Sequence, residues 1–441
     1  MSLPPRTRRI LDLALPIMGG MVSQNIMNLV DTGMVGSLGE AALAAVGMSS
    51  FATFMAQAFI MGLSSGVQAM SARRKGEGRE SEMALPLNGG LLMAVALGLP
   101  ISITLFALAP PLYPYLNDDP AVIEQGVPYF RARLCAVTVV GMNFAFRGYF
   151  NAVDLSRIYL RSLVTMHVAN LSLNYVLIFG KLGAPALGSL GAGVGSAIAT
   201  VVGLITYVFM AFRYARRAGF LRGLPDKPTL RTMLRLSLPS GVRQLFFAAG
   251  MTTLFWIVGR IGRAELAAAT VLINVTLVAI LPAIGLGMAA ATLVGQALGK
   301  GDTADAEQWG WDVARIAVGI LIVLGLPMAI APHAILDVFT DAPATIEAGA
   351  WPLRIVGLSI GIDGVAMVLQ NALLGAGDTR RVMVVGVGLQ WLVFLPIAFL
   401  IGPVLGYGLV GVWSAQVVYR SIQAGLFAQL WRGGRWASIV V

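Results

Sequence analysis

The sequence repeats itself with a constant offset of 223 residues. The segments LDLALP, VGSLGEAALAA and PAVIEQG begin at positions 11, 35 and 120, and they return as LRLSLP, VGRIGRAELAA and PATIEAG at positions 234, 258 and 343. Because this offset is about half of the 441 residues, the chain consists of two related halves. Related halves made of apolar segments are typical of membrane transporters, whose repeats pack around a central site.

The composition excludes an ordinary water-soluble domain. Hydrophobic residues make up 57% of the chain and charged residues only 12%, whereas soluble domains carry about a quarter charged residues. So few charges cannot cover the surface of 441 residues, so we expect a lipid bilayer to cover most of it. The 52 glycines fit helices that pack closely or bend within a membrane.

The apolar runs predict an all-α polytopic membrane protein with twelve transmembrane helices in two pseudo-symmetric six-helix bundles, at roughly 20 residues for each span. The predicted helices cover residues 11–35, 41–70, 83–109, 124–148, 160–180, 189–212, 233–258, 264–297, 311–335, 347–375, 382–402 and 405–431. The N-lobe is therefore predicted at 1–212, a cytoplasmic linker at 213–231 and the C-lobe at 232–441.

Basic residues predict the orientation of the chain. They gather in alternate connections, including residues 6–9, 73–79, 213–231 and 432–435, as the positive-inside rule expects for cytoplasmic segments. We therefore expect both termini in the cytoplasm and a multi-pass location in a bacterial cytoplasmic (inner) membrane. This distribution also accounts for the net charge of +10 without a nucleic-acid partner.

Few residue types are available for metal or enzyme chemistry. Cys135 is the one cysteine and there are two histidines, which excludes an internal disulfide, a cysteine-based metal site and a histidine-rich metal centre. No paired Asp-rich motif or activated nucleophile is evident. We therefore predict that the chain is not an enzyme, needs no cofactor and acts as a monomer.

Polar residues form two stripes in the first half of the chain. Gln24, Asn28 and Asp31 follow at i, i+4 and i+7 within the segment 11–35, so they share one helix face. His167, Asn170 and Asn174 follow at i, i+3 and i+7 within the segment 160–180.

Asp31 and Asn174 are at similar predicted depths, so these stripes could hold a proton or cation between them. An acid in a spanning helix costs about 2.5–3.5 kcal/mol on insertion scales and is functional by default. The alternative is that the amides make only structural bonds between helices.

A second intramembrane acid lies in the other half of the chain. Asp363 and Gln370 are seven residues apart in the segment 347–375 and share a helix face. Asp363 is predicted near mid-membrane. Its alternatives are a coupling role or a structural role as the partner of a nearby amide or of Arg354. Arg243 and Arg420 are expected near cytoplasmic helix ends, where arginine can extend its charged group to water.

At this point the chain resembles the multidrug and toxic compound extrusion (MATE) family, from about Leu11 to Trp431. The resemblance depends on motifs that begin at positions 28, 72, 170, 295 and 363: NLVDTGMVGSLGEAALAAVG, ARRKGEGR, NLSLNYVLIFGKLG, GQALGKGD and DGVAMVLQNALLGAGDTR. Asp363 and Asp378 are spaced as in the NorM-like branch. Asn174 stands where the DinF-like branch often has an aspartate, and Phe247 stands where NorM-like members usually have a glutamate, so features of both branches are mixed.

This resemblance implies two six-helix bundles around a central cavity. It also implies export of small organic, cationic compounds in exchange for protons or sodium ions. Asp31, Asp363, Asn174 and Asn170 match coupling positions of the family, with sodium expected at Asp363 or Asp31. Gln24, Asn28, His167 and Gln370 are candidates for the substrate cavity. The alternative function is a flippase for lipid-linked intermediates, which related folds perform.

Overall fold

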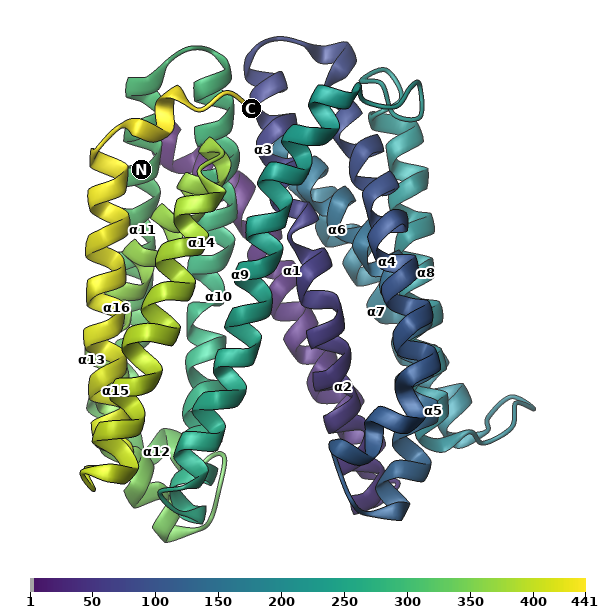
Figure 1. Cartoon of the computed structure of the whole chain (residues 1–441), viewed down its shortest axis with the longest axis vertical. Coiled ribbons are helices and arrows are strands. Elements are labelled where there is room, and N and C mark those ends of the chain that lie inside the picture. Colours follow the sequence, from purple (N-terminus) through teal and green to yellow (C-terminus); the bar gives the residue numbers. More distant parts are fainter. Residues whose placement is uncertain (1–3) are drawn as a thin grey trace. The chain divides into compact units, whose positions relative to one another are not determined.

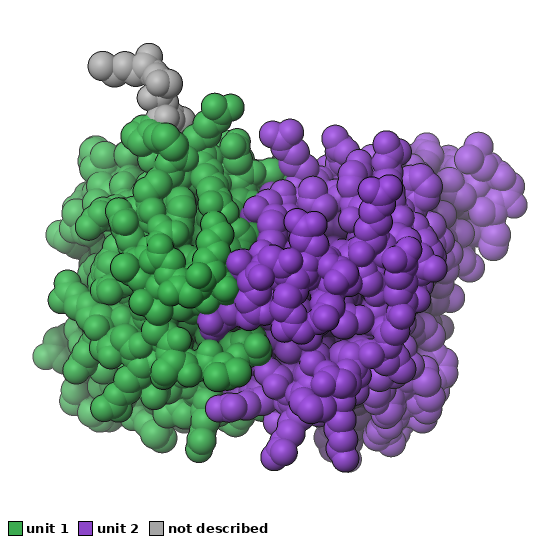
Figure 2. Space-filling view, turned by 90° about the horizontal axis from the view of Figure 1, so that it is seen from above, with its two compact units in different colours: residues 1–18, 242–441 green, residues 19–241 purple. Residues whose placement is uncertain are grey.

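The computed structural model describes residues 4–441, and over that range every regular element is a helix (Figure 1). This follows from the apolar composition, because backbone N–H and C=O groups in lipid must bond within their own segment. By contacts between residues the chain divides into two units. Unit 1 is Met1–Met18 with Val242–Val441, and unit 2 is Gly19–Gly241 (Figure 2).

Unit 2 contains the second half of α1 (Pro5–Gly36) and the elements that follow it up to the start of α9 (Lys227–Gly259). The elements between them are α2 (Glu40–Met61), α3 (Leu63–Gly76), η1 (Glu80–Glu82), α4 (Leu85–Leu112), η2 (Tyr113–Tyr115), α5 (Pro120–Cys135), α6 (Val137–Ala152), α7 (Ser156–Phe179) and α8 (Gly188–Tyr214). One-residue junctions at Gly62 and Ala136 keep helical dihedral angles, so α2–α3 and α5–α6 each continue as one rod.

Unit 1 contains the first half of α1 (Pro5–Gly36) and the second half of α9 (Lys227–Gly259). Its other elements are α10 (Arg263–Gly299), α11 (Thr303–Ile330), α12 (Pro332–Leu336), α13 (Pro343–Ala376), α14 (Thr379–Gly388), η3 (Leu389–Phe394), α15 (Leu395–Phe399), η4 (Leu400–Val404), α16 (Gly408–Arg432) and η5 (Arg435–Ser438). The rod from α14 to η4 includes two π-helical stretches, at η3 and η4.

The prediction of twelve membrane-length helices is confirmed for residues 4–441. Ten of the twelve rods are long and apolar enough to cross a membrane. The other two are α5–α6 and α16, which carry more polar residues. Each predicted range lies mainly on one rod, but the range 311–335 passes the end of α11 at Ile330 and includes most of the short helix α12.

Several helices begin earlier than the sequence predicts, among them α11, which begins at Thr303 where the sequence predicts residue 311. Helix α1 begins at Pro5 and α9 begins at Lys227, inside the segment 213–231. The start of α9 has a local cause, because the Asp226 carboxylate accepts a hydrogen bond from the Thr229 backbone N–H at 3.3 Å and Pro228 suits the first turn of a helix. The connection between α8 and α9 is therefore shorter than expected, at residues 215–226.

The contact units also differ from the sequence halves. Residues 5–18 of α1 belong to the unit that contains the C-terminal half, and residues 227–241 of α9 belong to the unit that contains the N-terminal half. In unit 1 the early part of α1 is held by Arg6, which donates to the carboxylates of Asp305 at 2.5 Å and Asp312 at 2.7 Å. The Arg6 guanidinium also lies 3.7 Å from the centre of the Trp309 ring.

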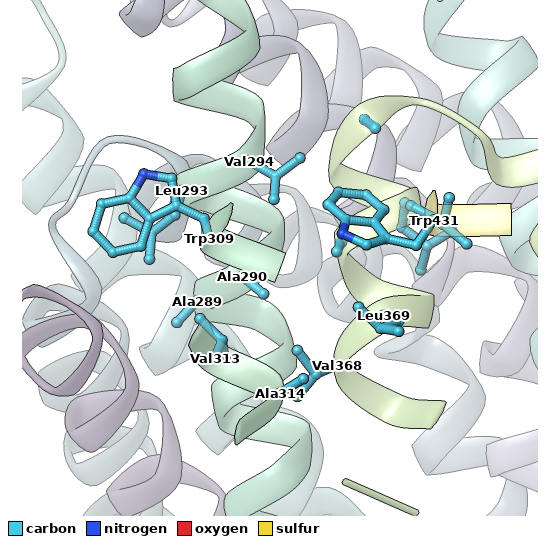
Figure 3. Close-up of a cluster of buried hydrophobic side chains, with 14 of the residues drawn as sticks. Ala289, Ala290, Leu293, Val294, Trp309, Val313, Ala314, Val368, Leu369 and Trp431 are labelled. Atoms are coloured by element: carbon cyan, nitrogen blue, oxygen red, sulfur yellow. The ribbon is translucent and has the colours of Figure 1, made fainter. Parts of the chain in front are cut away.

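The core of unit 1 includes a cluster contributed by α10, α11, α13 and α16 (Figure 3). The cluster combines small residues such as Ala289 and Ala290 with larger ones such as Leu369 and Trp431, and all four are buried. The helices approach closely, because a Cβ atom on Gly375 of α13 would overlap the backbone carbonyl of Ala291 on α10. Small residues allow such backbone contacts in membrane helices.

The core of unit 2 includes an aromatic group on α6 and α8. Phe146 stacks on Tyr207 with ring centres 5.4 Å apart, and Phe150 stacks on the same tyrosine at 5.9 Å. A Cβ atom on Gly148 would overlap the Ser64 carbonyl of α3, so α3 and α6 also pack at backbone distance. These contacts fix the frame on which α7 and α8 present their polar residues.

Candidate functional site

The structure brings Asp31 and Asn174 together within unit 2. The Asn174 side-chain amide on α7 donates to the Asp31 carboxylate on α1 at 2.8 Å. The same amide nitrogen donates to Asn170 Oδ1 at 2.9 Å, and Asn170 in turn donates to Ser196 on α8 at 3.0 Å. A carboxylate is thus held by a chain of amides and a hydroxyl that links three helices.

Asn174 is completely buried, whereas Asp31 is half-buried. The buried Asn174 Oδ1 has no hydrogen-bond partner among the described residues. It lies against Gly195 of α8, where a Cβ atom would overlap it. Gly195 therefore leaves the space that lets the Asn174 amide nitrogen point toward Asp31.

A second polar chain lies on the same pair of helices. His167 Nδ1 lies 2.6 Å from Ser23 Oγ, and His167 Nε2 lies 3.2 Å from Gln24 Oε1. Gln24 then donates to Asn28 Oδ1 at 3.0 Å. One neutral tautomer satisfies both contacts of the imidazole, with Nε2–H donating to Gln24 and Nδ1 accepting from Ser23. The two polar stripes read from the sequence therefore face each other, although their role in transport stays a prediction.

Asp363, the second intramembrane acid, is paired with an arginine in unit 1. Its Oδ1 lies 3.3 Å from Arg420 Nε, and the two side chains are only 14% and 22% exposed. The suggestion of Arg354 as its partner is wrong, because Arg354 donates to the Ala329 carbonyl at 3.1 Å. Gln370 is half-buried two helical turns farther along α13.

Arg420 and Arg243 do not lie at helix ends, contrary to the sequence prediction. Arg420 is at the middle of α16 and Arg243 is at the middle of α9. Arg420 donates to Gln423 at 3.1 Å, and Gln423 donates to the Tyr419 hydroxyl at 3.3 Å. Arg243 Nε has no hydrogen-bond partner among residues 4–441. Sequence reasoning could have found Arg420 from its position near the middle of the last apolar run, 405–431.

The described residues give little support for a metal centre. No group of three or more His, Cys, Asp or Glu side chains gathers within residues 4–441. At Asp363 the guanidinium of Arg420 lies where a cation would bind. Phe247, at the position where the resemblance implies a glutamate, offers only its backbone carbonyl, which accepts a bond from Gln390 at 3.5 Å.

Comparisons with known proteins agree with the repeated architecture. The family model described as MatE matches residues 16–176 and 239–400. A probable multidrug resistance protein NorM from a Synechococcus strain is 31% identical over 434 residues, covering 96% of this chain and 93% of the relative. A protein of the same name from Pseudomonas aeruginosa is 30% identical, covering 92% of this chain and 85% of that protein.

Solved structures show the same fold. An outward-facing multidrug resistance MATE family transporter of the MOP superfamily matches with a TM-score of 0.88 at 22% identity, covering 99% of this chain and 97% of the other. A MOP superfamily transporter from Pyrococcus furiosus matches with a TM-score of 0.87 at 22% identity, covering 97% of this chain and 95% of the other. Because the family model covers most of the sequence in two matched regions, this chain belongs to the MatE family of multidrug and toxic compound extrusion transporters.

Proposed function

We propose that the chain is a multidrug efflux antiporter that exports organic cations in exchange for protons. Its relatives in Synechococcus and Pseudomonas aeruginosa carry the name multidrug resistance protein, and the matching family consists of membrane transporters, not enzymes. The chain is thus a multi-pass membrane transporter of small organic compounds that uses no cofactor. The coupling ion and the charge of the substrate are proposed from the site.

The observation that carries the proposal is the contrast between the two intramembrane acids. Asp31 makes no ion pair among residues 4–441, and its hydrogen bond comes from the neutral amide of Asn174. Asp363 is instead neutralised by Arg420. Arg133 interacts electrostatically with Asp31 but forms no ion pair with it. An acid without a directly paired cation can exchange a proton and attract a cationic substrate, whereas a paired acid already has its counter-charge.

The same contrast favours protons over sodium. A sodium ion at Asp363 would lie beside the Arg420 guanidinium, and like charges at such a distance repel strongly where little water screens them. Asp31 has one amide neighbour within hydrogen-bond distance, and within residues 4–441 it belongs to no group of three or more His, Cys, Asp or Glu side chains. A proton needs only the carboxylate itself.

Protonation of Asp31 would change its link to α7. The bond from the Asn174 amide to a carboxylate is charge-assisted, and such bonds are about twice as strong as bonds between neutral groups. A proton on Asp31 weakens this link and removes the charge that attracts a cationic compound. Proton and drug therefore favour different states of the same residue, which is the condition for coupling.

We further propose an inner-membrane location with both termini in the cytoplasm, and a monomeric state. This orientation is supported by unit 1, where residues 6–9, Arg380, Arg381, Arg432 and Arg435 all lie at the helix ends near the two chain termini (Figure 1). Basic residues at one end of the helices indicate the cytoplasmic side.

The proposal is tested by dye efflux from proteoliposomes under a pH gradient and, separately, under a sodium gradient. We expect the wild-type protein to respond to the pH gradient alone and Asp31→Asn to lose that response. Asp12→Asn is the matched control, because it makes the same change on α1 at a side chain that is 62% exposed. An Asp31→Asn variant that folds and keeps full proton-driven efflux would contradict the proposal, as would efflux driven by sodium alone.

A flippase for lipid-linked intermediates is the second candidate. Arg243 favours it, because a guanidinium in the middle of α9 with an unpartnered Nε would suit a phosphate group. Scrambling of headgroup-labelled lipid is measured in the same vesicles. Scrambling that disappears in Arg243→Gln, together with absent dye efflux, would favour the flippase.

A further inference from the structure

A pocket of about 510 Å³ lies in unit 1 where α16 ends and α14 begins. Its polar lining comes from Arg381, Gln429 and Arg435, and its apolar lining includes Val385, Leu426 and Leu430. The volume is within the range of about 300–1,000 Å³ that is typical of small-molecule sites. None of the residues assigned to transport lines this pocket, so it needs a separate explanation.

The polar side of the pocket carries more positive than negative charge. Arg381 donates one bond, from Nη1 to the Asp378 carboxylate at 3.0 Å, and its side chain is 41% exposed. A guanidinium has five N–H donors, so Arg381 retains donors for a second anion. Asp378 offsets at most one of the two arginine charges. The exposed Arg435 and the amide of Gln429 complete a site for an anionic group.

The chain after α16 folds back and contributes Arg435 to the polar side of the pocket. Trp436 stacks on Trp431 with ring centres 4.0 Å apart, and its indole N–H donates to the Trp431 carbonyl at 2.6 Å. Both indole rings are buried. Arg435 precedes this anchored tryptophan, so the backbone that presents its guanidinium is fixed.

The apolar side of the pocket continues as a stripe along α16. Val418, Ile422, Leu426 and Leu430 follow at four-residue intervals and therefore share one face of the helix. Val418 is 57% exposed and Ile422 is 41% exposed. In a membrane-spanning helix such exposed apolar side chains contact lipid, so the stripe leads from the lipid tails into the pocket.

We infer that this pocket binds the headgroup of an anionic phospholipid. The phosphate lies between Arg381 and Arg435, and an acyl chain lies along the α16 stripe. Basic pockets between transmembrane helices on the cytoplasmic side are suited to such headgroups, and the basic helix ends of unit 1 place the pocket on that side. A soluble phosphate compound would use the arginines but would have no need of the apolar stripe.

The inference is tested on the purified full-length protein by native mass spectrometry, with phosphatidylglycerol or phosphatidylcholine added. We expect the wild-type protein to retain phosphatidylglycerol preferentially. The double variant Arg381→Gln/Arg435→Gln should weaken that binding by about tenfold or more, because each basic residue near an anionic lipid contributes favourable electrostatic free energy to binding. Arg217→Gln/Arg380→Gln is the matched control, since it removes the same charge at two exposed side chains that do not line the pocket.

Two further measurements separate the lipid from other sources of phosphate. Leu426→Asn should also weaken lipid binding, and inorganic phosphate at the same concentration should not displace the lipid. Equal retention by the Arg381→Gln/Arg435→Gln variant, an equal loss in the control, or displacement by inorganic phosphate would each overturn the inference. Thermal unfolding in phosphatidylcholine alone verifies that every variant is folded. Dye efflux is not used as a readout, so failure of this inference and failure of the proposed antiport are distinguishable.

Discussion

Asp363 and Arg420 form an ion pair, so the effects on protein stability of neutralising one and of neutralising the other should be coupled. At the observed 3.3 Å, Coulomb's law gives an attraction of about 5 kcal/mol for an effective dielectric constant of about 20. Removing one partner leaves the other charge in a poorly solvated place, which typically costs about 3–5 kcal/mol. Asp363→Asn or Arg420→Gln should therefore lower the thermal unfolding midpoint by roughly 6–20 °C, at about 2–4 °C for each kcal/mol.

The double variant Asp363→Asn/Arg420→Gln should be less destabilised than the sum of the two single variants, by up to about 3 kcal/mol, since no unpaired charge remains. Tryptophan fluorescence during thermal unfolding in detergent measures all three variants. The exposed pair Arg8 and Asp12, at 4.0 Å with side chains 78% and 62% exposed, is the control, and its coupling should not exceed about 0.5 kcal/mol.

Additive effects at Asp363 and Arg420 would refute the reasoning, because two independent side chains show no coupling. The double variant also informs the mechanism. If Asp363 serves only to neutralise Arg420, proteoliposomes containing the double variant should keep efflux driven by a pH gradient.

Three further predictions concern the Asp31 site, the start of α1 and the end of α13. Gly195→Ala should displace the Asn174 amide and reduce proton-driven efflux at least severalfold, whereas Gly203→Ala, which meets only a flexible methionine, should not; unchanged efflux in Gly195→Ala would contradict the positioning role. Arg6→Gln removes two ion pairs and should lower the thermal midpoint by several degrees, and an unchanged midpoint would count against this anchor. Burial raises the pKa of Asp378 above 3.8, with Arg381 opposing it. The folded state thus binds the proton more tightly, so wild-type stability relative to Asp378→Asn should fall as pH rises through that raised pKa. A relative stability that rises with pH over this range would contradict the assignment.

The sequence predicted the acid and amides of unit 2 well because their helix faces follow from spacing alone. Asp31 and Asn174 were placed at similar depths on two predicted helices, and the structure joins them by a hydrogen bond of 2.8 Å. The sequence did not predict that Ser23 and Ser196 take part in these hydrogen-bond chains, since isolated serines in apolar helices give no periodic signal. Nor did it predict the space at Gly195, which exists only because α8 packs against α7.

The surroundings of the arginines are the feature that the sequence predicts least well. Arg420 was expected to reach water, yet it lies mid-helix beside an acid that is 57 positions away in the chain. Depth within a helix depends on where the helix begins and ends, and a partner on another helix depends on packing. The ends of the last apolar run indicate the depth of Arg420, but local hydrophobicity does not indicate its partner.

By itself the sequence determined two related halves, twelve apolar segments and the faces on which polar residues lie. Lipid leaves an apolar chain little choice but the helix, and helical periodicity then fixes which residues are neighbours on one face. The tertiary structure decided which faces meet. It paired Asp363 with Arg420, assigned residues 1–18 to the unit that contains the C-terminal half, and folded Trp436 back onto Trp431. These outcomes depend on contacts between segments far apart in the chain, which arise only when the helices pack.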